Sequence, residues 1–395
     1  MGSYLTILVL LVLLAAVLRD DFAFTLIYVL VGAMTVGSWW SRRALSQVKY
    51  ERIYPDRAFL GEKLEVRLVI TNHGWLPLPW LRVHEGLPVA LSGPEALQRV
   101  VTMGSRRSTE FRYELEARKR GHYPIGPLFI SSGDILGLNA ELRRESEPEH
   151  LVVYPKIVPL SAVKIPSRSP QGTLRHSQPI FEDPTRVRGK REYMPGDSLR
   201  QVDWKSTAIT GRMQVKLFEP SIALETVIFL NLNASDYHYR TQLDATELAI
   251  VIAASIANWV IGKGQTLGLT VNGIDPLSNE EQPLDLPPRK GKGHLMRVLE
   301  NLARAEIKYE DAGFTELLRR QRHHLTWGTT LIVITGSADD ALLQELYQAR
   351  RSGQNTLLVL AGPVIASQEI RFRAGFYGIP VVPILNETGL DIWRR

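Results

Sequence analysis

The stretch TVIFLNL (226–232), followed by DATELAIVIAASIANWVI (244–261), decides the fold of the C-terminal half. The first run is continuously apolar, as in a strand buried on both faces of a parallel sheet. The second run predicts a helix, which Gly262 and Gly264 end. We expect further strands at 267–271, 331–335, 356–361 and 381–385, and helices at 294–306, 314–324 and 339–351. This alternation predicts a Rossmann-like α/β domain over residues 221–395, with helices on both faces of a parallel sheet and Pro383 at its edge.

In residues 46–165 the apolar residues recur with a different period. Alternate positions are apolar in two runs, Leu64, Val66, Leu68 and Ile70, and Phe111, Tyr113, Leu115 and Ala117. A period of two is typical of strands with one buried face, and Gly- and Pro-containing turns separate the runs. The pattern predicts an antiparallel β-sandwich of immunoglobulin-like type, which would act as a spacer or a binding surface.

The N-terminus carries two uncharged apolar runs, 3–18 and 22–40, separated by Arg19, Asp20 and Asp21. As helices they would be roughly 24 and 28 Å long, against about 30 Å of hydrocarbon in a bilayer. Backbone groups in lipid must pair internally, so we predict a transmembrane helical hairpin in residues 1–45. A cleaved signal peptide or a buried hairpin are the alternatives, but no basic residue precedes Tyr4.

Basic residues near the apolar runs predict the orientation. Five follow the second run, and only Arg19 lies in the turn; the five are Arg42, Arg43, Lys49, Arg52 and Arg57. The positive-inside rule then predicts a multi-pass protein of the inner (plasma) membrane with both termini in the cytoplasm. The chain has no cysteine, which excludes disulfides and thiol chemistry, and its formal net charge is +6. We expect the lipid bilayer as a partner and no nucleic acid.

A linker and a basic segment occupy residues 166–220. Between Arg186 and Lys216 there are eight basic and three acidic residues. Pro195-Gly196 predicts a turn, Asp197 or Ser198 a helix cap, and Gly211 the end of that helix. Three interpretations remain open: a docking surface for an acidic protein, contact with phosphate, anionic lipid or nucleic acid, or a structural role. In the structural role, Arg191 and Arg200 would pair with Asp197, Asp203 or Glu219 while Tyr193 and Trp204 pack.

One spacing in this segment is distinctive: Gly189-x-Arg191-x-Tyr193-x-Pro195-Gly196-Asp197-x-x-Arg200-x-x-Asp203-Trp204. It resembles the signature of the bacterial and archaeal domain-of-unknown-function family 58. The apolar hairpin and the motifs at 120–127 and 134–138 are similar to those of the same family. The resemblance implies a von Willebrand factor A-like C-terminal domain and association with MoxR-type AAA+ ATPases. It implies no enzymatic activity.

Metal-binding A-domains carry Asp-x-Ser-x-Ser after their first strand. Here the corresponding residues are Asn231, Asn233 and Ser235, and Thr335 stands where a later strand would supply an aspartate. Because Mg²⁺ prefers anionic oxygen ligands, we predict a degenerate site that binds no metal and whose loops contact a protein. The asparagines could instead only bond the loop backbone. In the alternative function, a metal-dependent ligand-binding A-domain of envelope or stress function, Asp236 would reach inward.

These features together predict an α+β multidomain chain without a cofactor. We expect a non-enzymatic, cytoplasm-facing scaffold or adaptor that docks a partner through its A-like domain and basic signature segment. The resemblance suggests that the partner is a MoxR-type ATPase. An enzyme of envelope metabolism that uses Asp197, Asp203 and the nearby arginines is a further hypothesis.

Overall fold

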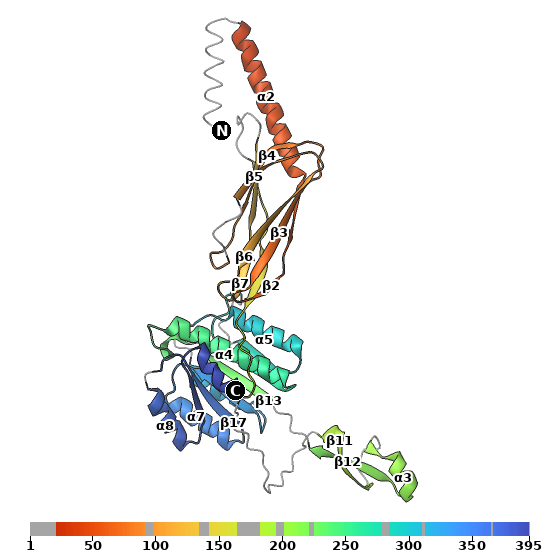
Figure 1. The fold of residues 1–395 in the computed structure, drawn as a ribbon, viewed down its shortest axis with the longest axis vertical. Coiled ribbons are helices and arrows are strands. Elements are labelled where there is room, and N and C mark those ends of the chain that lie inside the picture. Colours follow the sequence, from red (N-terminus) through yellow and green to blue (C-terminus); the bar gives the residue numbers. More distant parts are fainter. Residues whose placement is uncertain are drawn as a thin grey trace. The chain divides into compact units, whose positions relative to one another are not determined.

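The chain divides into two compact units, Met1–Lys156 and Ile157–Arg395 (Figure 1). The computed structural model describes residues 21–91, 98–133, 142–163, 182–194, 201–220, 225–277, 284–309, 313–364 and 366–394. The predicted apolar helix at 3–18 and most of the predicted linker lie outside these residues. The second unit starts before the predicted boundary at 165. Val158 N–H donates to Ser255 Oγ (2.9 Å) and Ser161 N–H to the Trp393 carbonyl (2.8 Å).

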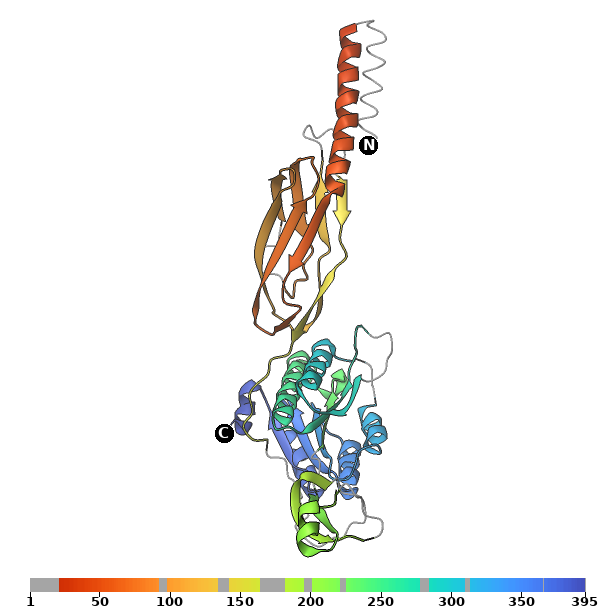
Figure 2. The same cartoon turned by 90° about the vertical axis from the view of Figure 1, so that its right-hand side faces the viewer.

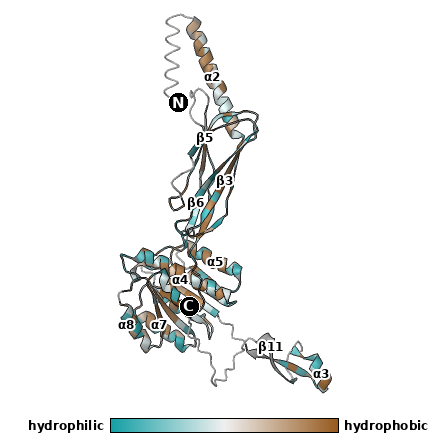
Figure 3. Cartoon of the chain, in the orientation of Figure 1, coloured by the Kyte–Doolittle hydropathy of each residue, from teal (hydrophilic) through white to brown (hydrophobic). Residues whose placement is uncertain are grey.

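Helix α2 (Asp21–Ser46) includes the second predicted apolar run and is long and apolar enough to cross a membrane. Figure 3 shows it as a mostly apolar helix, and large side chains such as Phe22, Tyr28 and Val29 are exposed. The last turns of α2 are less exposed, because Ala44 and Leu45 are buried in the core of the following β-domain. The helix therefore continues directly into that domain. A second helix of similar composition, α4 (Gln242–Gly262), is mostly buried and forms part of a protein core.

The first unit is a β-sandwich, as the period of two predicts. Its sheets are β1-β3-β6, β2-β10-β7 and β5-β4-β8-β9. Strand β3 alternates buried and exposed side chains, and Leu64, Val66, Leu68 and Ile70 all face the core. The strands are β1 (Val48–Ile53), β2 (Arg57–Phe59), β3 (Lys63–Asn72), β4 (Leu78–Glu85), β5 (Gln98–Met103), β6 (Ser108–Glu116), β7 (Gly121–Ile125), β8 (Leu128–Ser132), β9 (Leu142–Glu145) and β10 (Glu149–Tyr154).

A buried ion pair lies inside the sandwich. The Arg52 and Glu85 side chains are fully inaccessible and approach to 2.6 Å, and Arg52 also contacts Glu149 at 2.8 Å. The Tyr113 hydroxyl donates to Glu85. Burial opposes the charge of Arg52, but Glu85 and Glu149 raise its pKa above the usual value. Burial, and then the charge of Glu85, raise the pKa of Tyr113. Each charge is compensated only while the others are present.

The second unit contains the predicted α/β domain. Its sheet has the order β15-β14-β13-β16-β17-β18, parallel except for β15, and helices cover both faces (Figures 1 and 2). The strands are β13 (Glu225–Asn231), β14 (Thr266–Asn272), β15 (Leu284–Arg289), β16 (Thr330–Thr335), β17 (Asn355–Ala361) and β18 (Val381–Ile384). The helices are α4, α5 (Lys292–Arg304), α6 (Phe314–Arg322), α7 (Asp340–Arg351), α8 (Ser367–Phe376), and the short η2 (Ala234–Asp236) and η3 (Glu387–Trp393).

The strand β15, the helix α8 and the short helices η2 and η3 of this domain were not predicted. Pro287 and Pro288 indicated a chain break, but they lie in β15, which is an edge strand where missing N–H groups are tolerated. Helix α8 buries only Ile370 and Ala374, so its apolar period is weak. Strand β18 lies at the opposite edge and contains Pro383, as predicted.

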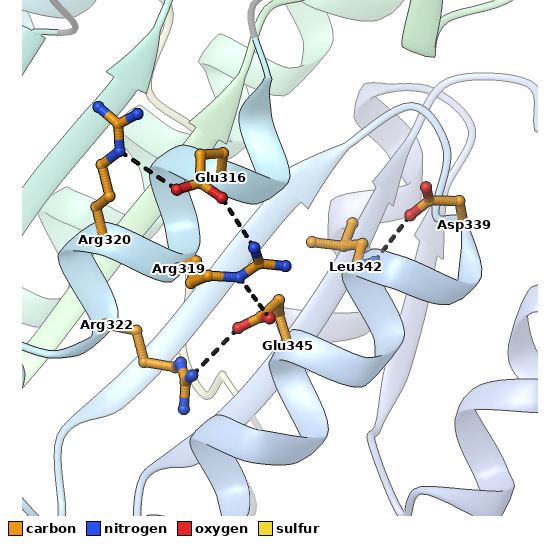
Figure 4. Close-up of polar contacts among 7 residues, drawn as sticks. All are labelled: Glu316, Arg319, Arg320, Arg322, Asp339, Leu342 and Glu345. Atoms are coloured by element: carbon orange, nitrogen blue, oxygen red, sulfur yellow. Dashed lines mark hydrogen bonds and ion pairs between the residues drawn. The ribbon is translucent and has the colours of Figure 1, made fainter.

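Ion pairs join helices α6 and α7 beside the sheet (Figure 4). Glu345 of α7 accepts from Arg319 (2.9 Å) and contacts Arg322 (3.2 Å), while Glu316 contacts Arg319 at 3.0 Å and Arg320 at 3.4 Å. At the start of α7, Asp339 Oδ1 accepts from the Leu342 backbone N–H (2.8 Å). These contacts fix α7 and the end of the loop that follows β16.

Replacement of Arg52 by methionine should destabilise the first unit by about 3–5 kcal/mol, because Glu85 would stay buried without its counter-charge. Urea unfolding of the full chain in detergent, followed by circular dichroism, measures this loss. Arg118→Met is the control: its pair with Glu116 is half exposed, and the expected loss is under about 1 kcal/mol. Equal losses in the two variants would contradict the assigned role of the buried pair.

Candidate functional site

The topology of the α/β sheet places two predicted site residues side by side. The chain runs outward from β13 to β14 and β15, and then from β16 to β17 and β18. Strands β13 and β16 are therefore neighbours at the point where the order reverses, the usual ligand position in open α/β sheets. Asn231 ends β13 and Thr335 ends β16.

The side chain of Asn231 connects the loops at this point. Its Nδ2 donates to Asp236 Oδ2 (2.7 Å) and Thr335 Oγ1 (3.1 Å). Its Oδ1 accepts from the Asn233 backbone N–H (3.0 Å) and from Asn272 Nδ2 (3.2 Å). A backbone N–H can only donate, so the orientation of the Asn231 amide is fixed by its partners. Asn231 and Thr335 are almost completely buried.

The loops after β13 and β16 also pack against each other. The Tyr237 hydroxyl donates to the Asn231 carbonyl (2.6 Å), and burial, then the charge of Asp236, raise the pKa of Tyr237. A Cβ atom at Gly336 would lie 2.3 Å from the Tyr237 ring and 2.5 Å from the Asp236 carbonyl. Position 336 therefore needs glycine. Asn233 is buried, whereas Ser235 is exposed and stands apart from Asn231 and Thr335.

A divalent cation does not fit this arrangement. Asp236 does reach inward, but its Oδ2 accepts an N–H from Asn231, and a second N–H of the same amide is directed at Thr335. Hard cations need oxygen lone pairs where these N–H groups lie. Asn231 also accepts from the loop backbone at Asn233, as one interpretation of the sequence proposed. Asn272 and Tyr237 were not predicted as part of this arrangement, although a polar residue at the end of the neighbouring strand was an available signal for Asn272.

The signature segment forms a small module of β11 (Glu182–Glu192), α3 (Trp204–Thr210) and β12 (Gln214–Pro220). Strands β11 and β12 pair antiparallel, with Gly189 opposite Leu217. Lys190 Nζ lies 2.8 Å from Asp203 Oδ2, and Asp203 Oδ1 accepts from the Ser206 backbone N–H (3.2 Å). The hydrogen bond from Lys190 and then that from Ser206 lower the pKa of Asp203 to about 2. Asp203 thus joins the helix to the strand pair.

The signature residues have different environments. Gly211 ends α3 in the left-handed conformation, as predicted, and Asp203 is its N-cap. Asp203 pairs with Lys190 rather than with an arginine, Arg191 donates to the Glu192 carbonyl (3.1 Å), and Tyr193 N–H donates to the Met213 carbonyl (2.9 Å). Trp204 is 66% exposed, so the interpretation in which it packs is wrong. The remaining predicted residues, Pro195, Gly196, Asp197, Ser198 and Arg200, lie outside the described residues.

Comparison with known proteins supports the family resemblance that was inferred from the signature residues of this module. Residues 189–371 match the family "Protein of unknown function DUF58". The matched segment begins at Gly189 of the signature and includes Asn231 and Thr335, which meet at the ends of β13 and β16.

Two relatives extend the comparison. "Uncharacterized protein YeaD" of Bacillus subtilis is 26% identical over 276 residues, which span 66% of this chain and 65% of that protein. "Uncharacterized protein Rv1480" of Mycobacterium tuberculosis is 29% identical over 113 residues, 29% of this chain and 34% of that protein. The chain thus matches less than two thirds of the length of either relative.

Among solved structures, a von Willebrand factor type A protein from Catenulispora acidiphila has a TM-score of 0.31 at 12% identity, covering 46% of this chain and 42% of that one. The CARDB domain of the PF1109 protein from Pyrococcus furiosus has a TM-score of 0.21 at 16% identity, and the match covers 27% of this chain and 91% of that one. These scores are low, so the description of the fold depends on the strand order and packing given above.

Asn231→Asp should destabilise the second unit by roughly 1–3 kcal/mol at neutral pH, because a carboxylate would replace the N–H donor that faces Asp236. Thermal unfolding of the full chain measures the loss. The matched control is the double variant Asn231→Asp with Asp236→Asn, which exchanges donor and acceptor. It should recover part of the lost stability and no more, because the new carboxylate at the buried position 231 has no counter-ion. Mg²⁺ should stabilise the single variant and leave the native chain unchanged. A single variant as stable as the native chain would contradict the assigned hydrogen bonds.

The low pKa of Asp203 predicts acid sensitivity of the signature module. Its pKa in the folded chain, about 2, lies below the ordinary value of 3.8, so the ionised group stabilises the module above that value. The stabilisation is lost as the pH falls from about 4 to about 2. Hydrogen-exchange protection of residues 203–217 should decrease over this interval in the native chain and not in Asp203→Asn. Glu192→Gln, which alters the exposed pair with Arg212, should retain the decrease.

Proposed function

We propose that the chain is a membrane-anchored, cytoplasm-facing scaffold that docks a protein partner through its signature module and α/β domain. The partner is a MoxR-type AAA+ ATPase, the class that the family resemblance implies. In this proposal the second unit has the von Willebrand factor A-like role of binding a protein, and the sandwich has an immunoglobulin-like spacing role. The chain performs no chemistry of its own.

The observation that carries the proposal is the exposure of apolar side chains on α3. None of the seven residues of this helix is buried, and Trp204 and Ile209 are 66% and 77% exposed. Met194, in the same module, is also exposed. A tryptophan and an isoleucine on a helix without buried residues favour a surface that a partner covers, because Trp is enriched among binding hot spots. The exposed Lys205 lies next to Trp204 in the chain and favours an acidic group on the partner.

The loops after β13 and β16, which form the rim of the α/β sheet, support a second contact that does not depend on a metal ion. The loops after β13 and β16 are held by the Asn231 amide and by the packing of Gly336 on Tyr237. The exposed Ser235 and Tyr239 lie on the loop after β13. A partner would therefore bind this rim at any Mg²⁺ concentration, in contrast to a metal-gated A-domain.

Of the two candidate catalytic carboxylates, Asp197 lies outside the described residues, and the environment of Asp203 favours a scaffold over an enzyme. Asp203 caps α3 and pairs with Lys190, so both groups already have structural partners. The membrane part of the proposal rests on α2, whose apolar side chains are exposed, and on Arg42 and Arg43 at its end. The positive-inside rule places these arginines, and the units that follow, in the cytoplasm.

Trp204→Ser combined with Ile209→Ser should weaken binding of a purified MoxR-type ATPase from the same genome by at least roughly tenfold. Biolayer interferometry with the full chain in nanodiscs measures the affinity, with ATP, with ADP and without nucleotide. The control is Phe372→Ser with Phe376→Ser, which removes two similarly exposed aromatic residues from α8.

Unchanged affinity in the α3 variant, or equal losses in both variants, would contradict docking through the signature module. Absence of binding by the native chain under all three nucleotide conditions would contradict the proposed partner.

A further inference from the structure

The end of the sandwich next to α2 collects arginines without acidic partners. Arg42 and Arg43 lie in the last turns of α2, and Arg106 and Arg107 lie between β5 and β6; all four are exposed. Among the described residues, none of these four forms an ion pair. On the sandwich strands, Arg67, Arg112 and Arg118 each contact a glutamate, and Arg52 pairs in the core. Four arginines that form no ion pair among the described residues are thus gathered at the α2 end of the unit.

These arginines border a built hollow. A cavity of about 150 Å³ is lined by Arg43 of α2, by His73 and Trp75 of the β3–β4 loop, and by Arg106. A second, larger hollow along α2 includes Trp39, Arg42 and again Arg43. Arg43 thus belongs to both hollows, and arginines of two separate segments, Arg43 and Arg106, line the smaller one.

The two loops of this hollow are held in place. The side chain of Asn72, which is fully buried, donates to the carbonyls of Leu76 (2.8 Å) and Gly104 (3.1 Å) and accepts from the Gly74 N–H (2.9 Å). Arg106 has a positive φ of 53°, unusual for a residue with a side chain, and its N–H donates to the Gly74 carbonyl (3.1 Å). These contacts position Arg106 before any ligand arrives.

Tryptophan residues of α2 and the β3–β4 loop lie beside this hollow and indicate its position relative to the membrane surface. Trp39 is exposed on α2, and Trp40 donates through Nε1 to the Pro77 carbonyl (2.9 Å), with its ring 6.4 Å from that of the exposed Trp75. Tryptophans of this kind sit at the interface between hydrocarbon and headgroups. Arg43 follows Trp39 by four residues, which is about 6 Å along the helix axis. When Trp39 lies at the edge of the hydrocarbon, Arg43 lies at the level of the lipid phosphate groups.

We propose that Arg42, Arg43, His73, Trp75 and Arg106 form a headgroup site that binds the phosphate of an anionic phospholipid of the cytoplasmic leaflet. The site rests on the proposed function, because α2 must lie in the membrane to bring lipid to it. Guanidinium groups recognise phosphate oxygens through paired N–H donors, and Trp75 packs on the glycerol and upper acyl region. The bound lipid fixes the first unit at a defined depth.

Lipid binding to the full chain in mild detergent tests this site. Native mass spectrometry counts bound phosphatidylglycerol and, in parallel, phosphatidylcholine of the same acyl length. We expect the native chain to prefer phosphatidylglycerol, and Arg43→Gln with Arg106→Gln to reduce that preference by roughly tenfold. Raising the salt concentration should weaken the preference in the native chain, since exposed charges are screened.

The matched control is Arg67→Gln with Arg112→Gln, which removes the same charge from arginines of the sandwich that contact glutamates. This control should keep the native preference, and both variants should keep the native thermal unfolding temperature. A preference that survives in Arg43→Gln with Arg106→Gln, or that falls equally in the control, would overturn the headgroup site. Displacement of phosphatidylglycerol by an equal concentration of inorganic phosphate would overturn the assignment to lipid.

Membrane flotation of the expressed chain separates this proposal from the one on which it rests. A chain that does not float with membranes contradicts the anchor. A chain that floats but shows no lipid preference contradicts the headgroup site alone.

Discussion

A single buried carboxamide organises the rim of the α/β domain. Asn231 donates twice and accepts twice, and its partners come from the loop that follows it and from the ends of β14 and β16. An amide can satisfy donors and acceptors together without a net charge, whereas a carboxylate in the same buried place would need a counter-ion. The rim is therefore ordered by the chain itself. A surface that needs no ion to hold its shape is suited to a permanent contact rather than one controlled by metal.

At the other end of the chain, the proposed membrane anchor is joined to the folded domain without a linker. Helix α2 continues without a break into the sandwich core through Ala44 and Leu45, and Trp40 bonds to the Pro77 carbonyl. A helix embedded in this way transmits its depth and tilt to the first unit, which a flexible linker would not do. Glutamates pair with Arg52 in the sandwich core and with Arg67 and Arg112 along it, whereas the arginines beside α2 form no ion pair among the described residues.

Sequence patterns predicted the elements whose burial is strongly periodic or continuous. Strand β13 and helix α4 lie within two residues of their predicted bounds, because both are rich in apolar residues over their whole length. Strand β15 was missed because Pro287 and Pro288 are excluded from central strands but not from edges. The meeting of Asn231 and Thr335 followed from the parallel order of the strands, whereas their bonds to Asn272 and Asp236 depend on side-chain geometry. The exposure of Trp204 disagrees with one of the three interpretations that the sequence left open for this segment, the one in which it packs.

The signature module explains why Asp203 and Trp204 are adjacent yet have opposite environments. A seven-residue helix with no buried side chain is marginal by itself, so α3 depends on its cap, on the pair with Lys190 and on the end at Gly211. These contacts place Trp204 and Ile209 outward in a fixed arrangement before a partner arrives, which lowers the ordering cost of binding. Under the proposed function, the module combines residues that hold the helix with exposed residues that a partner would contact. Acid would weaken the first set through Asp203 and, in consequence, disorder the second.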